Sequence, residues 1–275
     1  MPEVTTNGSP MEVVEHPFAY RVLEVKRTRW LTRRMLRVTL TGDELPGFRS
    51  DAADDGARLY VPPDPTDRSW RPVLEGRKLV FPGEQVPGNR EYTPRRYDAE
   101  TNELDIDFVV HGDGPISAWA ANAVPGHRLC VSGPRRSRMI TGTVDWYLLA
   151  GDESAIPSIS RRLEELPAGM TAFAFFEVAD EGERQPIESQ ANVEVSWLYR
   201  NEHAPDPNLL AGAIGGLTFP EGDVYAWAAG EASSMRAVRR HLLNERGLSP
   251  DRIRVTGYWK RSIPNWDHHL PLDEE

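Results

Sequence analysis

The pattern of hydrophobic residues changes character once along this chain, just after Arg138. Before that point, short runs of alternating polar and apolar residues are separated by turn-forming residues, and a single helical segment interrupts them. After it, continuous apolar runs alternate with helical segments. Short alternating runs favour an antiparallel barrel, whereas buried runs that alternate with helices favour a parallel sheet covered on both faces. The sequence therefore predicts a β domain followed by an α/β domain, with the boundary near residues 139–145.

The same patterns predict individual elements. In the first half we expect a helix at 115–123 and strands at 18–25, 35–41, 57–61, 77–81, 91–97, 104–110 and 128–132. In the second half we expect strands at 146–150, 171–178, 193–199, 224–229 and 253–259, helices at 156–166 and 231–246, and a short helix or loop at 211–217. The predicted organisation is a flexible N-terminus at 1–16, a barrel domain at 17–140, an α/β domain at 141–262 and a C-terminal tail at 263–275. The acidic, proline-rich stretch 51–76 is interpreted as a long loop around one short strand.

One stretch in the first half combines three kinds of chemistry. Residues 90–97 read Arg-Glu-Tyr-Thr-Pro-Arg-Arg-Tyr. In an extended chain, Arg90 and Tyr92 share one face, and Thr93 and Arg95 share the other. A cation, an aromatic ring and a hydroxyl are what a flavin nucleotide needs for its phosphates, its flat ring and its ring nitrogens. An arginine-rich and tyrosine-rich surface strand is the ordinary alternative for this stretch.

Three turns contain glycine and precede a helix, at 111–117, 150–157 and 229–235. Glycine lets a ligand approach the backbone, and the start of a helix presents free N–H groups to an anion. The first turn is a candidate pyrophosphate site. The other two follow strands of the predicted parallel sheet, where nucleotides bind, although neither contains G-x-G-x-x-G. Taken alone, each is equally typical of an ordinary capped helix.

The composition excludes several classes of function. The formal net charge is −10, which argues against a general nucleic-acid-binding or membrane-surface role. The single cysteine, Cys130, excludes an intrachain disulfide and a cysteine-based metal cluster. The chain shows no signal peptide and no apolar run near the roughly 18 residues of a membrane span, so we expect a cytoplasmic protein. The sequence contains no histidine metal-binding motif and no nucleophile-elbow motif.

The motifs, taken in order, resemble those of the siderophore-interacting protein family, which are flavin-dependent ferric-siderophore reductases of the ferredoxin reductase-like superfamily. The resemblance covers roughly residues 17–262. It rests on the segments 90–95, 107–115, 126 with 133–135, 150–157, 229–231 and 257–260. Two features depart from the family pattern. The 51–76 stretch is long, and Ser262 stands where the family usually has glycine.

The resemblance implies a Greek-key barrel that binds FAD and an α/β domain that brings NADH or NADPH to it. Arg90 is then expected to pair with the FAD phosphates, Tyr92 to pack on the flavin and Thr93 to lie near its reactive nitrogen. The backbone of Gly114–Ser117 is expected to hold the pyrophosphate. The full set of implied cofactor contacts comprises Arg90, Tyr92, Thr93, Arg95, Asp107, Val109, His111, Gly114, Pro115, Ile116, Ser117, Asp152, Ser154 and Ala155.

The implied substrate is an anionic ferric siderophore of catecholate or mixed type. Hard anionic oxygens hold ferric iron well and ferrous iron poorly, so one-electron reduction releases the metal. Such a reaction requires position and charge from the protein, with no catalytic acid, nucleophile or resident metal. Because the protein is acidic overall, the substrate entrance is expected to be locally basic. The candidates are Lys78, Arg135 and Lys260, with Arg136 and Arg261 as further choices.

The electron donor is less constrained by the sequence. Glu177, Asp180 and Glu181 follow the second strand of the α/β half, where an acidic side chain favours the ribose hydroxyls of NADH. Arg184 and Arg200 favour the 2′-phosphate of NADPH, and ferredoxin is a further candidate donor. Two alternative functions stay open: an NAD(P)H-flavin oxidoreductase with a protein or quinone acceptor, and a siderophore-binding protein that does not turn over.

Overall fold

The computed structural model describes residues 10–76, 78–83, 87–112, 114–201, 206–263, 266 and 272. The chain divides into two compact units. One comprises Val13–Met139, and the other comprises Met1–Glu12 and Ile140–Glu275. The predicted flexible segment 1–16 and tail 263–275 lie largely outside the described residues, but a strand that the sequence did not predict, β1 (Met11–Glu15), falls within the first of them.

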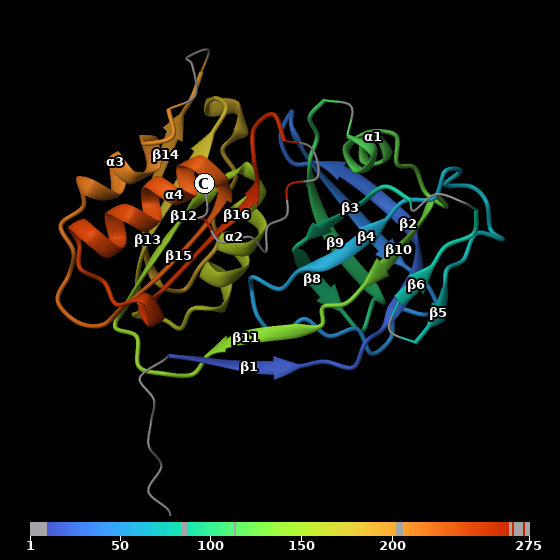
Figure 1. Ribbon diagram of the computed structural model, residues 1–275, viewed down its shortest axis with the longest axis horizontal. Helices are drawn as coiled ribbons and strands as arrows, with labels where there is room; N and C mark the ends of the chain where they lie inside the picture. Colours follow the sequence, from blue (N-terminus) through green and yellow to red (C-terminus); the bar gives the residue numbers. More distant parts are fainter. Residues whose placement is uncertain are drawn as a thin grey trace, which may run out of the picture. The chain divides into compact units, whose positions relative to one another are not determined.

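A seven-stranded antiparallel sheet forms the first unit, in the order β7-β4-β10-β2-β3-β9-β8 (Figure 1). Its strands are β2 (Tyr20–Trp30), β3 (Met35–Thr41), β4 (Ala57–Tyr60), β7 (Asn89–Tyr92), β8 (Pro94–Asp98), β9 (Glu103–Val109) and β10 (Arg128–Ser132). The two edge strands, β7 and β8, are consecutive in the chain and are separated only by Thr93. The sheet is therefore nearly closed into a barrel, as the sequence predicts, because one sharp corner joins its two edges.

Alternation along β9 explains how the barrel fills its interior and covers its outside. Leu104, Ile106 and Phe108 belong to the core, while the carboxylates between them face outward. Those carboxylates are buried by basic side chains of neighbouring strands: Arg27 donates to Glu103 at 2.7 Å, Arg37 to Asp107 at 2.7 and 2.8 Å, and Arg96 to Asp105 at 3.1 Å. The paired charges satisfy one another at the surface of the barrel, where the Arg27 and Arg96 side chains stay 49% and 44% exposed.

One helix packs against the core of the barrel. Helix α1 (Pro115–Ala121) contacts β3, β7 and β9, and it buries Ile116, Trp119 and Ala120 in the barrel core. Proline at the first helical position suits the start of a helix, where its missing N–H has no partner to lose. The helix is two residues shorter than predicted because Asn122 ends it.

The acidic stretch 51–76 is better ordered than the sequence predicts. It contains β4 and also β5 (Val73–Glu75), which pairs with β6 (Lys78–Val80) in a separate hairpin. Trp70 is buried and stacks on Phe81, with ring centroids 5.8 Å apart, in a small apolar cluster that includes Val22 and Cys130. The stretch therefore packs as a folded excursion along the outside of the barrel. Strands β1 and β11 (Arg136–Ile140) form a separate two-stranded sheet, and each strand contains a residue at which the chain passes from one unit to the other.

The second unit is built on a five-stranded parallel sheet in the order β14-β13-β12-β15-β16, which confirms the predicted fold class. The strands are β12 (Trp146–Asp152), β13 (Thr171–Val178), β14 (Asn192–Tyr199), β15 (Val224–Glu231) and β16 (Ile253–Trp259). The helices are α2 (Ile156–Glu165), α3 (Leu209–Gly215) and α4 (Ala232–Arg240). Helices α3 and α4 share one core with the sheet, and α2 packs on β12 and β13. From β12, the chain adds β13 and β14 on one side of the sheet and then β15 and β16 on the other side. Ligands bind to sheets of this kind at the point between β12 and β15 where the strand order reverses.

The last helix differs from the prediction. A single helix was expected over 231–246, but α4 ends at Arg240 and a π-helical turn, η3 (His241–Glu245), follows it. Arg246 accounts for the change, because its guanidinium donates to the carbonyl oxygens of Ile214, Gly215 and Leu217 at 2.6–3.2 Å. The same guanidinium donates to the His241 ring at 3.2 Å. Three short 3-10 turns complete the unit: η1 (Glu153–Ala155), η2 (Glu181–Glu183) and η4 (Pro250–Arg252).

Candidate functional site

The 90–97 stretch forms the corner that closes the barrel. Arg90 pairs with Leu59 and Tyr92 with Ala57 on β4, while beyond Thr93 the chain joins β9 instead. The prediction of one continuous strand at 91–97 is therefore wrong. A register shift between Pro94 and Arg96 places Arg95 in a bulge, so strand parity does not define its face. The cations and the aromatic ring that were expected on one strand therefore lie on the two sides of the corner, and the hydroxyl residue Thr93 forms the corner itself.

Gly88 brings this corner to the start of α1. A β-carbon built at Gly88 would lie 2.6 and 2.8 Å from two ring carbons of Pro115, closer than side-chain carbons approach one another. Only glycine lets β7 and the first turn of α1 approach to this distance. The Gly88 carbonyl also accepts a hydrogen bond from the Val61 N–H at 3.0 Å, which fixes the strand in this position. Arg90 and the Gly114–Ser117 segment are thus held at one end of the barrel.

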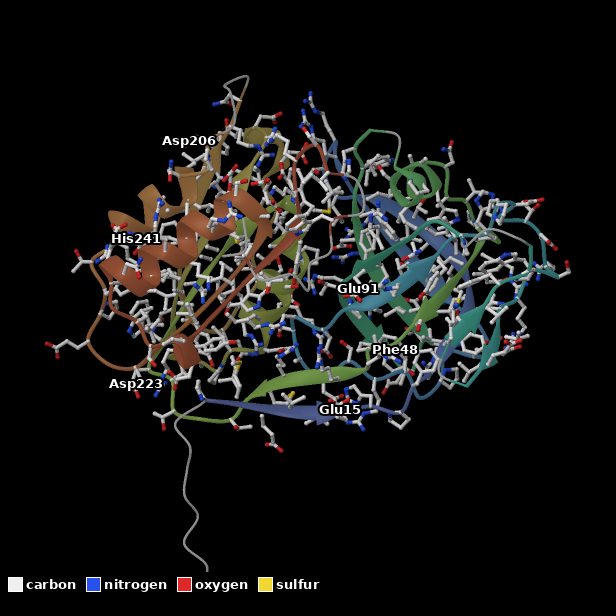
Figure 2. All side chains as sticks on the ribbon, in the orientation of Figure 1. Glu15, Phe48, Glu91, Asp206, Asp223 and His241 are labelled. Carbon is white, nitrogen blue, oxygen red and sulfur yellow. The ribbon has the colours of Figure 1, made fainter. Side chains whose placement is uncertain are left out.

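Arg90 is a half-buried cation at this end. Its guanidinium donates to the Asn89 carbonyl at 2.6 Å, and no carboxylate of the described residues lies within ion-pair distance of it. Its neighbour Glu91, labelled in Figure 2, is exposed and pairs with Arg58 at 3.0 Å instead. A partly buried guanidinium that is not matched by a protein carboxylate is suited to an external anion such as a phosphate.

Tyr92 and Thr93 follow Arg90 at the corner. The Tyr92 ring packs on Phe108 with centroids 4.6 Å apart, and Phe108 contacts Trp119 of α1 at 5.9 Å. Burial raises the pKa of Tyr92, an effect that the Arg90 charge partly opposes, so the phenol stays neutral. Thr93 is buried between the two strands. The corner therefore presents a rigid aromatic ring with a hydroxyl residue beside it.

The first turn of α1 is arranged to leave backbone donors available. Gly114 is the N-cap and has no side chain to occupy the helix start. The Ser117 hydroxyl accepts a hydrogen bond from the His111 N–H at 2.8 Å, which ties the loop to the helix. Such an arrangement is suited to a pyrophosphate group. His111 is exposed at the edge of this loop, and Val109, at the end of β9, pairs with Met35.

Two of the implied cofactor contacts have protein partners instead. Asp107 accepts both hydrogen bonds of Arg37 on the outer face of the barrel, and the Arg95 Nε atom lies 4.0 Å from the same carboxylate. These contacts give Asp107 and Arg95 a structural role in fixing the bulge of β8 against β9. Their contact with a cofactor stays a prediction.

These features together fit FAD. The barrel end offers a cation that pairs with no carboxylate of the described residues, an aromatic ring that packs on Phe108, and a helix start that lies against Gly88. Its chemistry matches a diphosphate joined to a flat heteroaromatic ring. Arg90, Tyr92 and the Gly114–Ser117 backbone would hold the group.

The second candidate region lies at the carboxyl edge of the parallel sheet. Ala150 pairs with Ala228 and Gly151 with Ala229, so the 150–157 and 229–235 turns lie at one edge, as predicted. Asp152 joins them: its carboxylate accepts from the Ser154 N–H at 2.9 Å, the Glu231 N–H at 2.8 Å and the Trp259 indole at 2.8 Å. Burial, then the neighbouring Glu153 charge, raises the pKa of Asp152.

Close packing at this edge restricts what can bind there. A β-carbon on Gly151 would lie 2.4 Å from the Ala229 carbonyl oxygen and from the Ala155 side chain. The Glu231 carboxylate accepts from the Ser233 and Ser234 N–H groups at 2.7 and 3.1 Å, so α4 is capped by an acid of its own chain. Asp152, Ser154 and Ala155 therefore build the edge, and their contact with a nicotinamide nucleotide stays a prediction.

Two of the three acidic residues that favoured NADH have partners within the protein, whereas the third, Glu181, is 81% exposed. Glu177 is buried and pairs with Arg200 at 3.4 Å, and Arg200 also pairs with Glu153. Burial raises the pKa of Glu177 to about 7, because the Arg200 charge offsets desolvation only in part. Asp180 accepts from the Gly182 N–H at 2.9 Å. The structure therefore gives Glu177 and Asp180 roles in holding the ends of β13 and β14 together.

Of the predicted substrate-binding residues, Lys78 and Arg135 belong to the first unit. Lys78 is exposed on β6, and exposed Arg135 lies over the Phe18 ring at 5.0 Å. The Arg135 charge acts on Tyr60, whose ring lies 4.7 Å from Phe81, just beyond β6. Both cations thus border the aromatic cluster outside the barrel. Arg136 begins β11 and is exposed.

Lys260 and Arg261 belong to the second unit and each accompanies a tryptophan. The Lys260 Nζ atom lies 5.0 Å from the Trp266 ring centroid, and the Arg261 guanidinium lies 5.9 Å from that of Trp259. Trp259 is 39% exposed although its indole N–H is bound to Asp152. Ser262 has φ of 63°, the left-handed region that favours glycine, so the turn keeps the backbone that a glycine would give. The sequence indicated both cations, with Trp259 as part of the 257–260 motif, but gave no sign of Trp266.

Two family descriptions match consecutive parts of the chain. "Siderophore-interacting FAD-binding domain" matches residues 24–138, and "Siderophore-interacting protein" matches residues 144–262. The ferric vibriobactin reductase of Vibrio cholerae is 37% identical over 262 residues, which cover 93% of this chain and 96% of that protein. The chain belongs to the siderophore-interacting protein family. The predicted resemblance is confirmed.

Other family members and neighbours agree with this assignment. An NADPH-dependent ferric-chelate reductase of Escherichia coli is 31% identical over 249 residues, covering 90% of this chain and 95% of that protein. A siderophore utilization protein from T. fusca has a crystal structure that matches with a TM-score of 0.81 at 41% identity, over 94% of this chain and all of that one. Ferredoxin reductases share the fold.

Two further observations concern metals and membranes. Among the residues that the structure describes, no group of three or more acidic, histidine or cysteine side chains could hold a metal ion. In the same part of the chain, none of the helices is both long enough and apolar enough to cross a membrane.

Proposed function

We propose that this protein is an FAD-dependent ferric-siderophore reductase that uses NADPH or NADH to reduce Fe(III) to Fe(II) and so release iron. The barrel, 17–140, binds FAD, and the α/β domain, 141–262, receives the nicotinamide donor. The observation that carries the proposal is the corner at Arg90–Thr93, which Gly88 holds against the start of α1. Its chemistry suits FAD, and two relatives of this chain, at 37% and 31% identity, are named as ferric reductases.

Each residue at the corner has a task that follows from its position. The Arg90 guanidinium neutralises a phosphate, and the N–H groups at the start of α1 hold the pyrophosphate. Tyr92, whose ring is supported by Phe108, would pack on the flavin, and Thr93 would offer its hydroxyl to the ring nitrogens. FAD, when bound, takes an electron pair from a nicotinamide and delivers electrons singly to iron. The protein thus needs no nucleophile and no proton-transfer residue on the siderophore itself.

The substrate is proposed to be an anionic siderophore with aromatic iron-binding groups, of catecholate or mixed type. Lys260 and Arg261 provide positive charge, and Trp259 and Trp266 provide flat rings beside them. Cations interleaved with aromatic rings suit a ligand whose negative oxygens lie on aromatic rings. Lys78 and Arg135 add positive charge at the first unit. The ferric vibriobactin reductase supports this substrate class through its name.

NADPH is the proposed donor, with NADH and ferredoxin as alternatives. The sequence-based preference for NADH rested on three acidic residues, and because Glu177 and Asp180 have partners within the protein, only Glu181 still supports it. A relative that is named as NADPH-dependent favours NADPH. Because nicotinamide donors are kept reduced in the cytoplasm, we place the reaction there.

A ferrous-trap assay tests this function. FAD-loaded protein is mixed without oxygen with a ferric triscatecholate and a ferrous chelator, and NADPH, NADH and reduced ferredoxin are supplied in parallel. We expect ferrous complex to form with NADPH and to require both FAD and protein. Rapid reduction of a quinone or protein acceptor without ferrous iron would favour the flavin oxidoreductase alternative. A protein that binds the siderophore but never takes up flavin would favour the binding-protein alternative.

A further inference from the structure

The hairpin tip between β2 and β3 exposes an aromatic ring and positive charge together. The tip comprises residues 30–34, Trp-Leu-Thr-Arg-Arg, and is here called the Trp30 tip. Trp30 is 52% exposed, the second largest exposure among the large apolar side chains described, and Arg33 and Arg34 are both exposed. The tip therefore presents a flat ring and two positive charges on a protein whose net charge is −10.

The Trp30 tip has a defined shape. The Leu31 N–H donates to the Met35 carbonyl at 2.8 Å, which closes the turn. The Thr32 hydroxyl accepts from the N–H groups of Met35 and Arg34 at 3.0 and 3.3 Å. Its side chains are therefore presented from a fixed backbone, which lowers the entropy lost when a ligand binds.

Register shows which way the tryptophan faces. Trp30 pairs with Leu36 and Thr28 with Val38, and both partners belong to the barrel core. The neighbouring Arg29 pairs with Arg37, whose side chain binds Asp107 on the outer face. Trp30 therefore lies on the inward-facing side of the sheet, at the end of β2, where exposure shows that the core no longer covers it.

The Trp30 tip adjoins the loop that leads into α1. The Val110 N–H donates to the Arg34 carbonyl at 2.7 Å, and Met35 pairs with Val109. The tip, the His111 loop and the start of α1 thus follow one another at the same end of the barrel, and α1 in turn contacts β7.

We propose that the Trp30 tip binds the adenosine end of FAD, with Trp30 stacked on the adenine and Arg33 and Arg34 facing the diphosphate. The inference rests on the proposed function and extends it to a further subsite. FAD carries its flavin, diphosphate and adenosine in linear order. Gly88 brings the Arg90 corner to the start of α1, and the hydrogen bond from Val110 to Arg34 brings the Trp30 tip to the loop that leads into α1. Stacking on an aromatic side chain suits a purine, and arginine suits a diphosphate.

Comparing FAD with FMN isolates this subsite, because FMN lacks the adenosine half. Apo-protein is titrated with each flavin, and the ratio of the two dissociation constants is measured. Trp30→Ala is expected to raise the dissociation constant of FAD about tenfold and to leave that of FMN unchanged. Trp30→Phe keeps a ring at the position and is expected to restore most of the ratio. Arg29→Ala, on the opposite face of the same strand, is the matched control and is expected to keep the wild-type ratio.

Each outcome bears on one proposal. An unchanged FAD to FMN ratio in Trp30→Ala would overturn the subsite. A raised KM for the ferric siderophore with an unchanged FAD to FMN ratio would also overturn the subsite, because the Trp30 tip would then bind the siderophore. Failure of the wild-type protein to bind either flavin would instead overturn the proposed function. Circular dichroism of each variant confirms that the barrel is folded before the titrations are compared.

Discussion

Gly88→Ala tests the contact that brings Arg90 to the start of α1. The added methyl carbon would lie 2.6 Å from the Pro115 Cβ and 2.8 Å from its Cγ. Carbon atoms in contact prefer about 3.5–4.0 Å, so one of the two segments must move by roughly an ångström. Pro115 is exposed and begins a short helix, whereas β7 is held in a sheet. The helix start is therefore expected to yield.

Overpacking of this kind costs about 1–3 kcal/mol. If the apo-protein relaxes by moving the helix start, FAD must restore the original geometry when it binds. The same free energy then appears as a dissociation constant raised about fivefold to a hundredfold. If the protein cannot relax, the free energy appears instead as a lower unfolding temperature of the apo-protein. The structure predicts that the loss in FAD-binding free energy and the loss in unfolding free energy together amount to about 1–3 kcal/mol.

The assay combines FAD titration of the apo-protein with its thermal unfolding. Gly212→Ala is the matched control, because it adds the same methyl in α3 with no atom within 4 Å. We expect Gly88→Ala to weaken FAD binding, to lower the unfolding temperature or both, whereas Gly212→Ala does neither. If Gly88→Ala matches Gly212→Ala in both measurements, Gly88 does not hold the corner against the helix, and the reasoning fails.

Two further predictions concern the second unit. Lys260→Glu is expected to raise the KM for a ferric triscatecholate several-fold with unchanged flavin content. Arg68→Glu makes the same charge change on the exposed 51–76 stretch and is expected to leave the KM unaltered. Equal KM values for the two variants would refute the role of Lys260 in substrate binding. The pKa of Glu177 is about 7 in the folded state, against 4.5 for the free side chain. Between pH 4.5 and 7 the folded state therefore binds more protons than the unfolded state. The stability that the protonated Glu177 contributes is lost as the pH rises through about 7. Glu177→Gln is therefore expected to reduce the fall in unfolding free energy between pH 5 and pH 8, by on the order of 2 kcal/mol. Glu181→Gln, whose side chain is 81% exposed, serves as its control, and identical pH profiles for wild type and Glu177→Gln would contradict the prediction.

The two-part fold could be predicted because periodicity is a local property. Alternation in 104–110 and continuous apolar runs in 146–150 and 171–178 correspond to β9, β12 and β13 within two residues. Chain order also placed two glycine-containing turns at one edge of the parallel sheet, because parallel strands share their carboxyl ends. These inferences needed no knowledge of which distant residues meet.

Features set by long-range packing could not be predicted in the same way. The corner at Thr93 looks like part of an ordinary strand, and only the pairing of β7 with β4 and of β8 with β9 reveals the bend. Trp70 gives the 51–76 stretch its place, yet its partner Phe81 lies beyond that stretch. Residue type alone gives no sign of either contact.

Charged residues were the hardest to interpret from sequence. Glu177 looked free to meet a ribose, but Arg200, which follows β14, pairs with it. Asp107 looked like a cofactor contact, but Arg37 occupies its carboxylate. In both cases the partner lies on a neighbouring strand, so only the register identifies it. Gly88 was missed because its function depends on Pro115, with which it shares no motif.

The central claim is that Arg90 holds FAD at the barrel corner and that this FAD reduces ferric siderophore. The most direct test measures ferrous iron formed from a ferric triscatecholate by apo-protein as FAD is added, for wild type and Arg90→Ala. Removing a charged hydrogen-bond partner costs about 1.5–3 kcal/mol, so half-saturation is expected to need roughly ten to a hundred times more FAD in Arg90→Ala. At saturating FAD the two rates should approach each other. If Arg90→Ala retains full FAD and saturates at the wild-type concentration, the corner is not where FAD is bound.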